Sequence, residues 1–190
     1  MTPTSDHVIR RDDVALLVVD VQERLAAVMP RRAEVVAATS LLMRTAELLG
    51  IPIIATRQNP GGLGPIVPEI AGLVTSIAVD KLSFDCMAED TFVSALQGTG
   101  RRQVVLVGME AHICVAQTAL ALLAAGYSVH VVADAVCSRR DTDRDVALAR
   151  LRHAGVEVTT AEAVAFEAVG EAGTGEFRAA LALVKDRDAS

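Results

Sequence analysis

The sequence is poor in aromatic side chains: only 3% of its 190 residues are Phe, Tyr or Trp, and Trp is absent. Because 52% of the residues are hydrophobic, the core must be built mainly from aliphatic side chains. The three cysteines are too few and too scattered for a disulfide framework or a zinc knuckle. We therefore expect reduced thiols and a cytoplasmic protein.

The sequence also lacks the usual features of proteins that bind nucleic acids or membranes. Its formal net charge is −6, and it has no run of Lys and Arg that would favour a phosphate backbone. No basic segment followed by an apolar one opens the chain, so we expect no signal peptide. No apolar stretch reaches the length of a membrane span. The expected partner is a small-molecule substrate, with no nucleic acid and no membrane.

Short apolar runs alternate with helical patterns along the whole chain. Strands are predicted at 15–19, 52–56, 76–79, 104–108, 128–132 and 156–160. Helices are predicted at 32–49, 90–96, 114–126 and 141–153, with two more after the last strand. Strands that are apolar on both faces and separated by helices are typical of a parallel sheet covered on both sides. The sequence predicts a single doubly wound, six-stranded α/β domain over residues 1–190, with a loose N-terminus at 1–10.

Three chemically reactive residues follow predicted strands. Asp20 ends the first strand, Lys81 lies just past the third, and Cys114 follows the fourth. Because ligands of such folds bind beyond the carboxyl ends of the strands, we expect these side chains to face the same edge of the sheet. Cys114 would also begin a helix, and the free amides at a helix N-terminus stabilise a thiolate.

These residues have the chemistry of a cysteine nucleophile and its partners. Such a nucleophile needs a group that takes its proton and donors for the developing oxyanion. Asp20 is the natural proton acceptor, and Lys81 would hold both groups in an ion network. The backbone amides of Glu110 and Cys114 would bind the oxyanion. This chemistry requires no metal and no cofactor, and the other two cysteines, Cys86 and Cys137, are interpreted as buried core residues.

Three separated motifs carry a resemblance to a known family. Val18–Gln22, Lys81 with Phe84, and Gly108–Val115 resemble the isochorismatase-like cysteine hydrolases, and most of all the isochorismatase domain-containing proteins of unassigned substrate. The likeness covers nearly the whole chain after the first ~10 residues.

The resemblance implies a catalytic triad and an assembly of subunits. The triad would be Asp20, Lys81 and Cys114, beside a cis peptide bond between Met109 and Glu110. The resemblance also implies a homo-oligomer, a dimer or larger, to which the apolar C-terminal helix at 177–184 would contribute an interface.

Two departures from the family's patterns narrow the expected reaction. Nicotinamidases of this superfamily bind a metal through an Asp-x-His…His cluster after the second strand, but residues 56–64 contain no histidine. Members that act on isochorismate, a vinyl ether, replace the nucleophilic cysteine, which is retained here as Cys114. The expected reaction is therefore metal-independent hydrolysis of a small amide or related acyl compound through a covalent acyl-Cys114 intermediate.

Other functions stay open at this point. The chain could be a non-catalytic binding or scaffold protein that keeps the fold and pocket, or an isochorismatase-type vinyl ether hydrolase. A redox enzyme is disfavoured, because no resolving cysteine lies near Cys114 in the sequence. Four further residues are candidates for substrate binding, although packing or a surface turn explains each equally well: Gln22, Gln58, Phe84 and His112.

Overall fold

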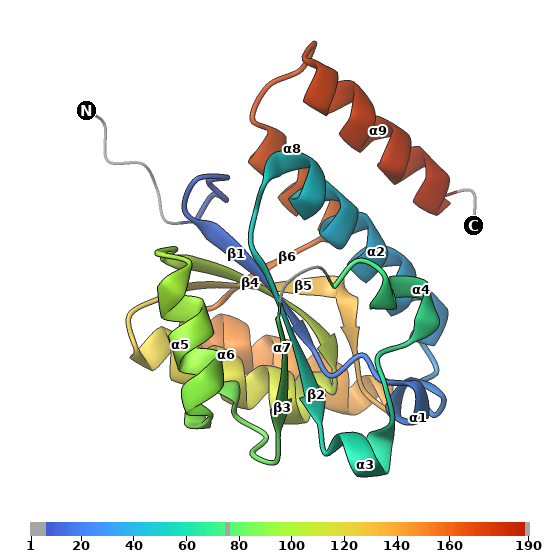
Figure 1. Cartoon of the computed structure of the whole chain (residues 1–190), viewed down its shortest axis with the longest axis vertical. Helices are drawn as coiled ribbons and strands as arrows, with labels where there is room; N and C mark the ends of the chain where they lie inside the picture. The colour runs from blue at the N-terminus through green and yellow to red at the C-terminus, as the bar shows by residue number, and fades with distance from the viewer. Residues whose placement is uncertain (1–6, 75–76, 189–190) are drawn as a thin grey trace.

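The protein is described by a computed structural model that covers residues 7–74 and 77–188. Within these residues the chain forms a six-stranded sheet in the order β3-β2-β1-β4-β5-β6, and each strand is parallel to its neighbours (Figure 1). The strands are β1 (Val14–Val19), β2 (Ile53–Gln58), β3 (Ile77–Lys81), β4 (Gln103–Met109), β5 (Ser128–Cys137) and β6 (Glu157–Thr159). The predicted doubly wound fold is confirmed.

Helices cover both faces of the sheet. They are α1 (Glu23–Ala26), α2 (Arg32–Leu49), α3 (Pro60–Leu63), α4 (Pro68–Ala71), α5 (Asp90–Gly98), α6 (Ala116–Ala124), α7 (Asp141–Ala154), α8 (Ala161–Val169) and α9 (Gly175–Asp188). A 3₁₀ turn spans Cys86–Ala88, and a π-helical turn spans Ala111–Val115. Buried residues of α2, α4 and α8 pack on one face, and those of α5, α6 and α7 pack on the other.

Residues of β1 show how the two layers share the sheet. Val14, Leu16 and Val18 belong to the core on the α2 side. The alternate residues, from Ala15 to Val19, belong to the core on the α6 side. Successive side chains of a strand point to opposite faces, so a strand buried on both faces must be apolar throughout.

The N-terminus differs from its prediction. The stretch 1–10 was expected to be loose, but Ile9 is only 2% exposed, and its N–H donates to Glu167. The N–H of Arg10 donates to the side chain of Gln103. The prediction is therefore wrong for these two residues, because an apolar side chain and two backbone donors find partners on the sheet and on α8. Residues 1–6 lie outside the described part of the chain.

Several predicted element boundaries also shift. Strand β5 continues five residues beyond the predicted end at Val132, because Val136 and Cys137 pair with Gly108 and Met109 of β4 after a shift in register. The predicted third strand began at Ser76, which lies outside the described residues. The helix expected to begin at Cys114 instead begins at Ala116, after the π-helical turn.

Gly108 brings the end of β4 unusually close to β1. It pairs with Val19, and a Cβ atom added at Gly108 would lie 2.0 Å from the Val19 carbonyl oxygen. Its φ of +119° lies in a region that residues with a Cβ atom rarely adopt. The next residue after Val19, Asp20, also has a positive φ of +52°. This close approach places the turn after β4 beside the end of β1.

Candidate active site

Asp20 and Lys81 form a fully buried ion pair at the carboxyl ends of β1 and β3. The Nζ atom of Lys81 lies 2.7 Å from Oδ2 of Asp20, and both side chains are 0% exposed. Burial alone would lower the pKa of Lys81, but the charge of Asp20 and the hydrogen bond to it raise that pKa overall. Lys81 is therefore a permanent cation in the site.

The thiol of Cys114 joins this pair. It lies close enough to the Asp20 carboxylate for that group to act on its pKa, and only 5% of Cys114 is exposed. Burial, and then the charge of Asp20, raise the pKa of Cys114 to about 12. The expectation of a thiolate stabilised by a helix N-terminus is therefore wrong for the resting site. The buried thiol keeps its proton beside the carboxylate.

A second set of buried groups lies behind Asp20. The hydroxyl of Thr56, at the end of β2, donates to Oδ1 of Asp20 over 2.7 Å. The side chains of Thr118 and Thr56 both lie near enough to the Cys86 thiol to act on its pKa. The N–H of Cys86 also donates to the Thr118 hydroxyl over 3.0 Å. Sequence reasoning missed this network, although a polar residue at the end of a strand next to β1 was a usable signal for Thr56.

Gln22 and Gln58 form a clasp within the protein. The Gln22 amide donates to the carbonyls of Gln58 and Gly64 and accepts from the N–H of Gln58. The Gln58 side chain accepts from Lys81 over 2.7 Å and donates to the Leu82 carbonyl. Both amides thus use their oxygen and nitrogen on the protein itself. We assign them to holding Lys81 and the loop after β2 rather than to binding substrate.

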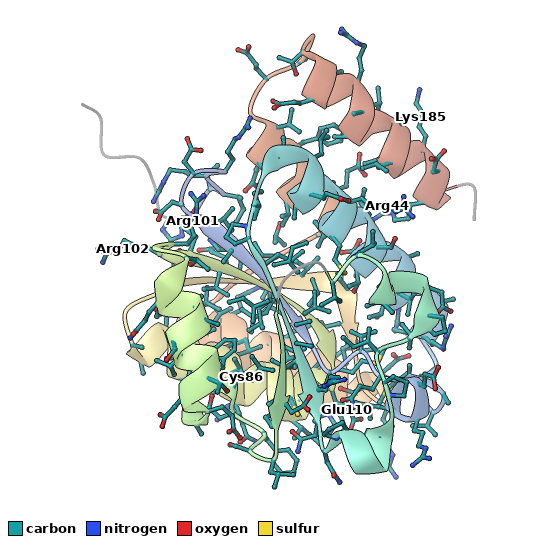
Figure 2. The ribbon with its side chains drawn as sticks, viewed as in Figure 1. Arg44, Cys86, Arg101, Arg102, Glu110 and Lys185 are labelled. Atoms are coloured by element: carbon teal, nitrogen blue, oxygen red, sulfur yellow. The ribbon has the colours of Figure 1, made fainter. Side chains whose placement is uncertain are left out.

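The turn after β4 is fastened to the segment after β5. The peptide bond between Met109 and Glu110 is cis, where the resemblance implies one. The buried carboxylate of Glu110 accepts from the N–H and the Nε of Arg139, at 3.0 and 3.1 Å. Figure 2 shows Glu110 and Cys86 in the same lower part of the molecule. The Glu110 carbonyl accepts from Ile113 and Val115, and these bonds use neither the Glu110 amide nor the Cys114 amide.

The other two candidates for substrate binding lie at the rim of the site. The Nδ1 atom of His112, which is partly exposed, lies 2.9 Å from the Ser138 hydroxyl. Phe84, beyond the end of β3, is 50% exposed. Neighbouring Leu82 is 76% exposed. An apolar rim therefore borders the buried polar groups on the β3 side.

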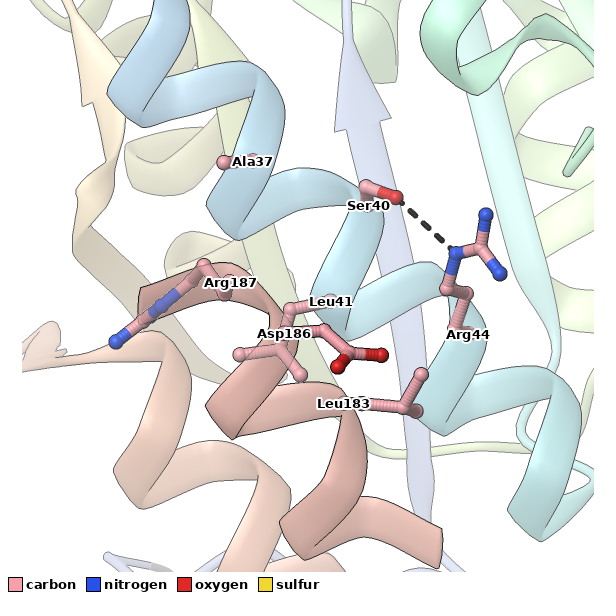
Figure 3. A pocket seen from close by; sticks show the side chains of 7 residues that line it. All are labelled: Ala37, Ser40, Leu41, Arg44, Leu183, Asp186 and Arg187. Atoms are coloured by element: carbon pink, nitrogen blue, oxygen red, sulfur yellow. Dashed lines mark hydrogen bonds between the residues drawn. The ribbon is translucent and has the colours of Figure 1, made fainter. Parts of the chain in front are cut away.

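A separate hollow lies between α2 and α9. Its volume is about 270 Å³, and its lining includes Ser40, Arg44 and Asp186 (Figure 3). The Nε of Arg44 lies 3.4 Å from the Ser40 hydroxyl. Figure 1 places α9 at the opposite end of the molecule from α3. This lining holds no cysteine, so we do not place the proposed chemistry there.

The residues that the structure covers show neither a cluster of metal ligands nor a membrane-spanning helix. Residues 7–74 and 77–188 contain no group of three or more His, Cys, Asp or Glu side chains that could hold a metal ion. Within the same ranges, every helix is too short or too polar to cross a membrane.

Comparisons with known proteins agree on one family. Residues 14–163 match the isochorismatase domain. Isochorismatase domain-containing protein 2 of Danio rerio is 41% identical over 163 residues, which cover 86% of this chain and 82% of that protein. Isochorismatase domain-containing protein 1 of Salmo salar is 35% identical over 87% of this chain. The match spans only 59% of that longer relative.

Solved structures share the whole fold. The structure titled MAR1 ribonuclease from Caenorhabditis elegans has a TM-score of 0.88 and 36% identity, covering 94% of this chain and 92% of that one. YcaC from Pseudomonas aeruginosa, solved with covalent acrylamide, has a TM-score of 0.84 and 26% identity, over 100% and 98% of the two chains. YcaC from Escherichia coli, described as an octameric hydrolase of unknown specificity, has a TM-score of 0.82 and 26% identity, over 95% and 88%. The chain therefore belongs to the isochorismatase family of hydrolases.

Proposed function

We propose that the protein is a metal-independent cysteine hydrolase that cleaves a small amide or a related acyl compound. The observation that carries this proposal is the buried contact of the Cys114 thiol with Asp20, which is paired in turn with Lys81. A carboxylate held beside a thiol can take its proton at the moment of attack. Both side chains of the pair are fully buried. A buried ion pair adds little to stability, so a role in the reaction explains its presence better.

The proposed reaction has two halves. In the first, Asp20 takes the thiol proton as Sγ of Cys114 bonds to the acyl carbon, and then gives that proton to the leaving amine. The product is a thioester between the acyl group and Cys114. In the second, Asp20 takes a proton from water as its oxygen attacks the thioester. The carboxylic acid leaves, and the proton returns to the sulfur of Cys114.

Lys81 and the backbone of the turn have supporting roles in this mechanism. Lys81 keeps its charge throughout and keeps Asp20 in place through the 2.7 Å contact. The amides of Glu110 and Cys114 are the proposed donors to the oxyanion in both halves. Donors fixed before the reaction cost no reorganisation when the negative charge develops. The contacts of Glu110 with Arg139 support this role, because they fix the turn that carries both amides.

Replacing Cys114 by Ala should abolish hydrolysis. In a panel of small amides and acyl compounds, we expect turnover to fall at least about a thousandfold, because the nucleophile is gone. Cys137→Ala is the matched control, since Cys137 is also a buried free thiol with a pKa of about 12 but is not bonded to Asp20. That variant should keep its activity.

The same panel separates the alternatives. Undiminished hydrolysis of these compounds by Cys114→Ala would contradict the proposal. Cleavage of an added vinyl ether that persists in Cys114→Ala would favour vinyl ether chemistry, which does not need this thiol. A binding protein would show unchanged ligand affinity in both variants and no turnover in either. Covalent acrylamide in the Pseudomonas aeruginosa relative supports a nucleophile in this fold, so labelling of Cys114 by acrylamide, located by peptide mass spectrometry, is a direct second readout.

We do not carry ribonuclease activity over from the Caenorhabditis elegans structure. A net charge of −6 opposes binding to a phosphate backbone, since such binding draws its affinity from Lys and Arg. A small-molecule substrate fits the buried thiol better. We also propose a homo-oligomer, supported by the octameric Escherichia coli relative, and a cytoplasmic location, supported by three free cysteines.

A further inference from the structure

A chain of buried side chains connects the Asp20 carboxylate to the helix that follows Cys114. Thr56 at the end of β2 donates to Asp20, and Cys86 in the 3₁₀ turn contacts Thr56. Cys86 also contacts Thr118, which lies on α6 one turn after Cys114. Thr56, Cys86 and Thr118 are at most 1% exposed. The network therefore reaches Asp20 through Oδ1, whereas Lys81 holds Oδ2.

The protons in this chain have one consistent direction. A hydroxyl has a single proton, and Thr56 gives its proton to Asp20. The Cys86 thiol can therefore act on the Thr56 oxygen only as a donor. Burial raises the pKa of Cys86 to about 11, so the thiol has that proton at neutral pH. The Thr118 hydroxyl already accepts from the N–H of Cys86, which leaves its own proton free to point at the sulfur.

We propose that Thr56 is a positioning residue that keeps Asp20 in its charged, proton-accepting form, and that Cys86 orients the Thr56 hydroxyl for this task. The inference rests on the proposed role of Asp20 as the base for Cys114. Hydrogen bonds to a carboxylate favour its charged form. Oδ2 has Lys81 as its donor, and Oδ1 has Thr56.

The other groups that face Asp20 would not replace this bond. The Nζ atom of Lys81 already donates to three acceptors, which are Oδ2 of Asp20, Oε1 of Gln58 and the carbonyl of Ser83. It therefore has no donor left for Oδ1 of Asp20. The remaining titratable neighbours are the thiols of Cys86 and Cys114, both protonated at neutral pH. Without the Thr56 hydroxyl, Oδ1 loses a donor in a place that water does not reach. That loss disfavours the carboxylate relative to the carboxylic acid.

The test is the pH dependence of Cys114 alkylation by iodoacetamide in Thr56→Val. We expect the acid limb of the alkylation rate to move up by about one pH unit, because Val has the shape of Thr without its donor. Thr56→Ser should restore the wild-type limb. Thr45→Val is the matched control, since Thr45 is also a buried threonine but bonds to the Leu41 carbonyl within α2. Its limb should not move.

Cys86→Ala gives a second, independent arm in case Thr56→Val does not fold. It should shift the limb in the same direction by a smaller amount, since Thr56 keeps its proton but loses its orientation. Acid limbs that coincide with the wild type in both variants would overturn the inference. The labelling readout needs no substrate, so it separates this outcome from failure of the proposed hydrolysis, which Cys114→Ala tests.

Discussion

At the residue scale, burial outweighs the helix in setting the state of Cys114. A helix N-terminus favours a thiolate by a modest amount. Loss of water and the adjacent Asp20 charge act against it and raise the pKa to about 12. The thiol therefore becomes nucleophilic only when Asp20 accepts its proton, which couples activation to attack on a bound substrate.

Thr39 in α2 offers a stability test at this scale. It is 0% exposed, and its hydroxyl has no hydrogen-bond partner among the described residues. A buried polar group without a partner costs about 1–3 kcal/mol. Thr39→Val keeps the shape and removes this cost, so we expect the free energy of unfolding to rise by about 1 kcal/mol, measured by urea denaturation.

Thr45 is the comparison, because it lies in the same helix and its hydroxyl donates to the Leu41 carbonyl over 2.9 Å. Thr45→Val should lower the free energy of unfolding by about 1 kcal/mol, since it removes a bond that is made. Equal effects of the two substitutions, in either direction, would show that the Thr39 hydroxyl is satisfied.

Some site residues could be predicted from the sequence, and others could not. Asp20, Lys81 and Cys114 each follow a strand, and the carboxyl ends of parallel strands meet at one edge, so their proximity follows from chain order. The positions of Thr56 and Cys86 depend on the register of β2 against β1 and on the path after β3. Local sequence patterns mark Thr56 as a polar residue near a strand end, but they carry no signal for this register or this path.

At the scale of elements, the packing of β4 against β1 leaves no room for a side chain at Gly108. Gly108→Ala would put a methyl group 2.0 Å from the Val19 carbonyl oxygen, at a φ of +119°. We expect the free energy of unfolding to fall by about 3 kcal/mol or more, because the strands must separate. Thermal and urea denaturation would measure this loss.

Gly155 at the end of α7 is the matched glycine. Its φ is +99°, but a Cβ atom there would meet no atom within 4 Å. Gly155→Ala should therefore cost only about 1 kcal/mol, from the backbone conformation alone. If the two substitutions lowered the free energy of unfolding equally, the close approach of β4 to β1 would not be the reason that Gly108 requires glycine.

Element boundaries were less predictable than the elements themselves. Apolar runs located all the strands of the sheet and the long helices, because periodicity reports burial. The π-helical turn before α6 and the extension of β5 were not predictable. The extension depends on pairing between distant segments, such as Val136 with Gly108.

At the scale of the whole molecule, the three buried thiols predict sensitivity to alkali. Their pKa values rise from 9.0 to about 11 for Cys86 and about 12 for Cys114 and Cys137, with burial as the main cause. Above pH 9.0 the unfolded chain loses these protons while the folded protein keeps them. The stability present below that pH is therefore lost as pH rises toward the folded pKa values. Lys81, whose pKa is also raised, acts in the same direction.

Urea unfolding at about pH 8 and about pH 10.5 would measure this effect. We expect a clear fall in the midpoint at the higher pH, and a fall about one third smaller in Cys137→Ala, which removes one of the three thiols. A midpoint independent of pH over this range would mean that the thiols ionise equally well in the folded protein.

The order of the strands has a consequence for how the chain is made. Asp20 and Lys81 belong to β1 and β3, but β1 lies between β2 and β4, so one side of it stays unpaired until residues 103–109 have been synthesised. An open strand edge of this kind readily pairs with other chains. When β4 docks, it covers that edge and also delivers Cys114. On the ribosome, protection from aggregation and completion of the reactive centre would therefore coincide.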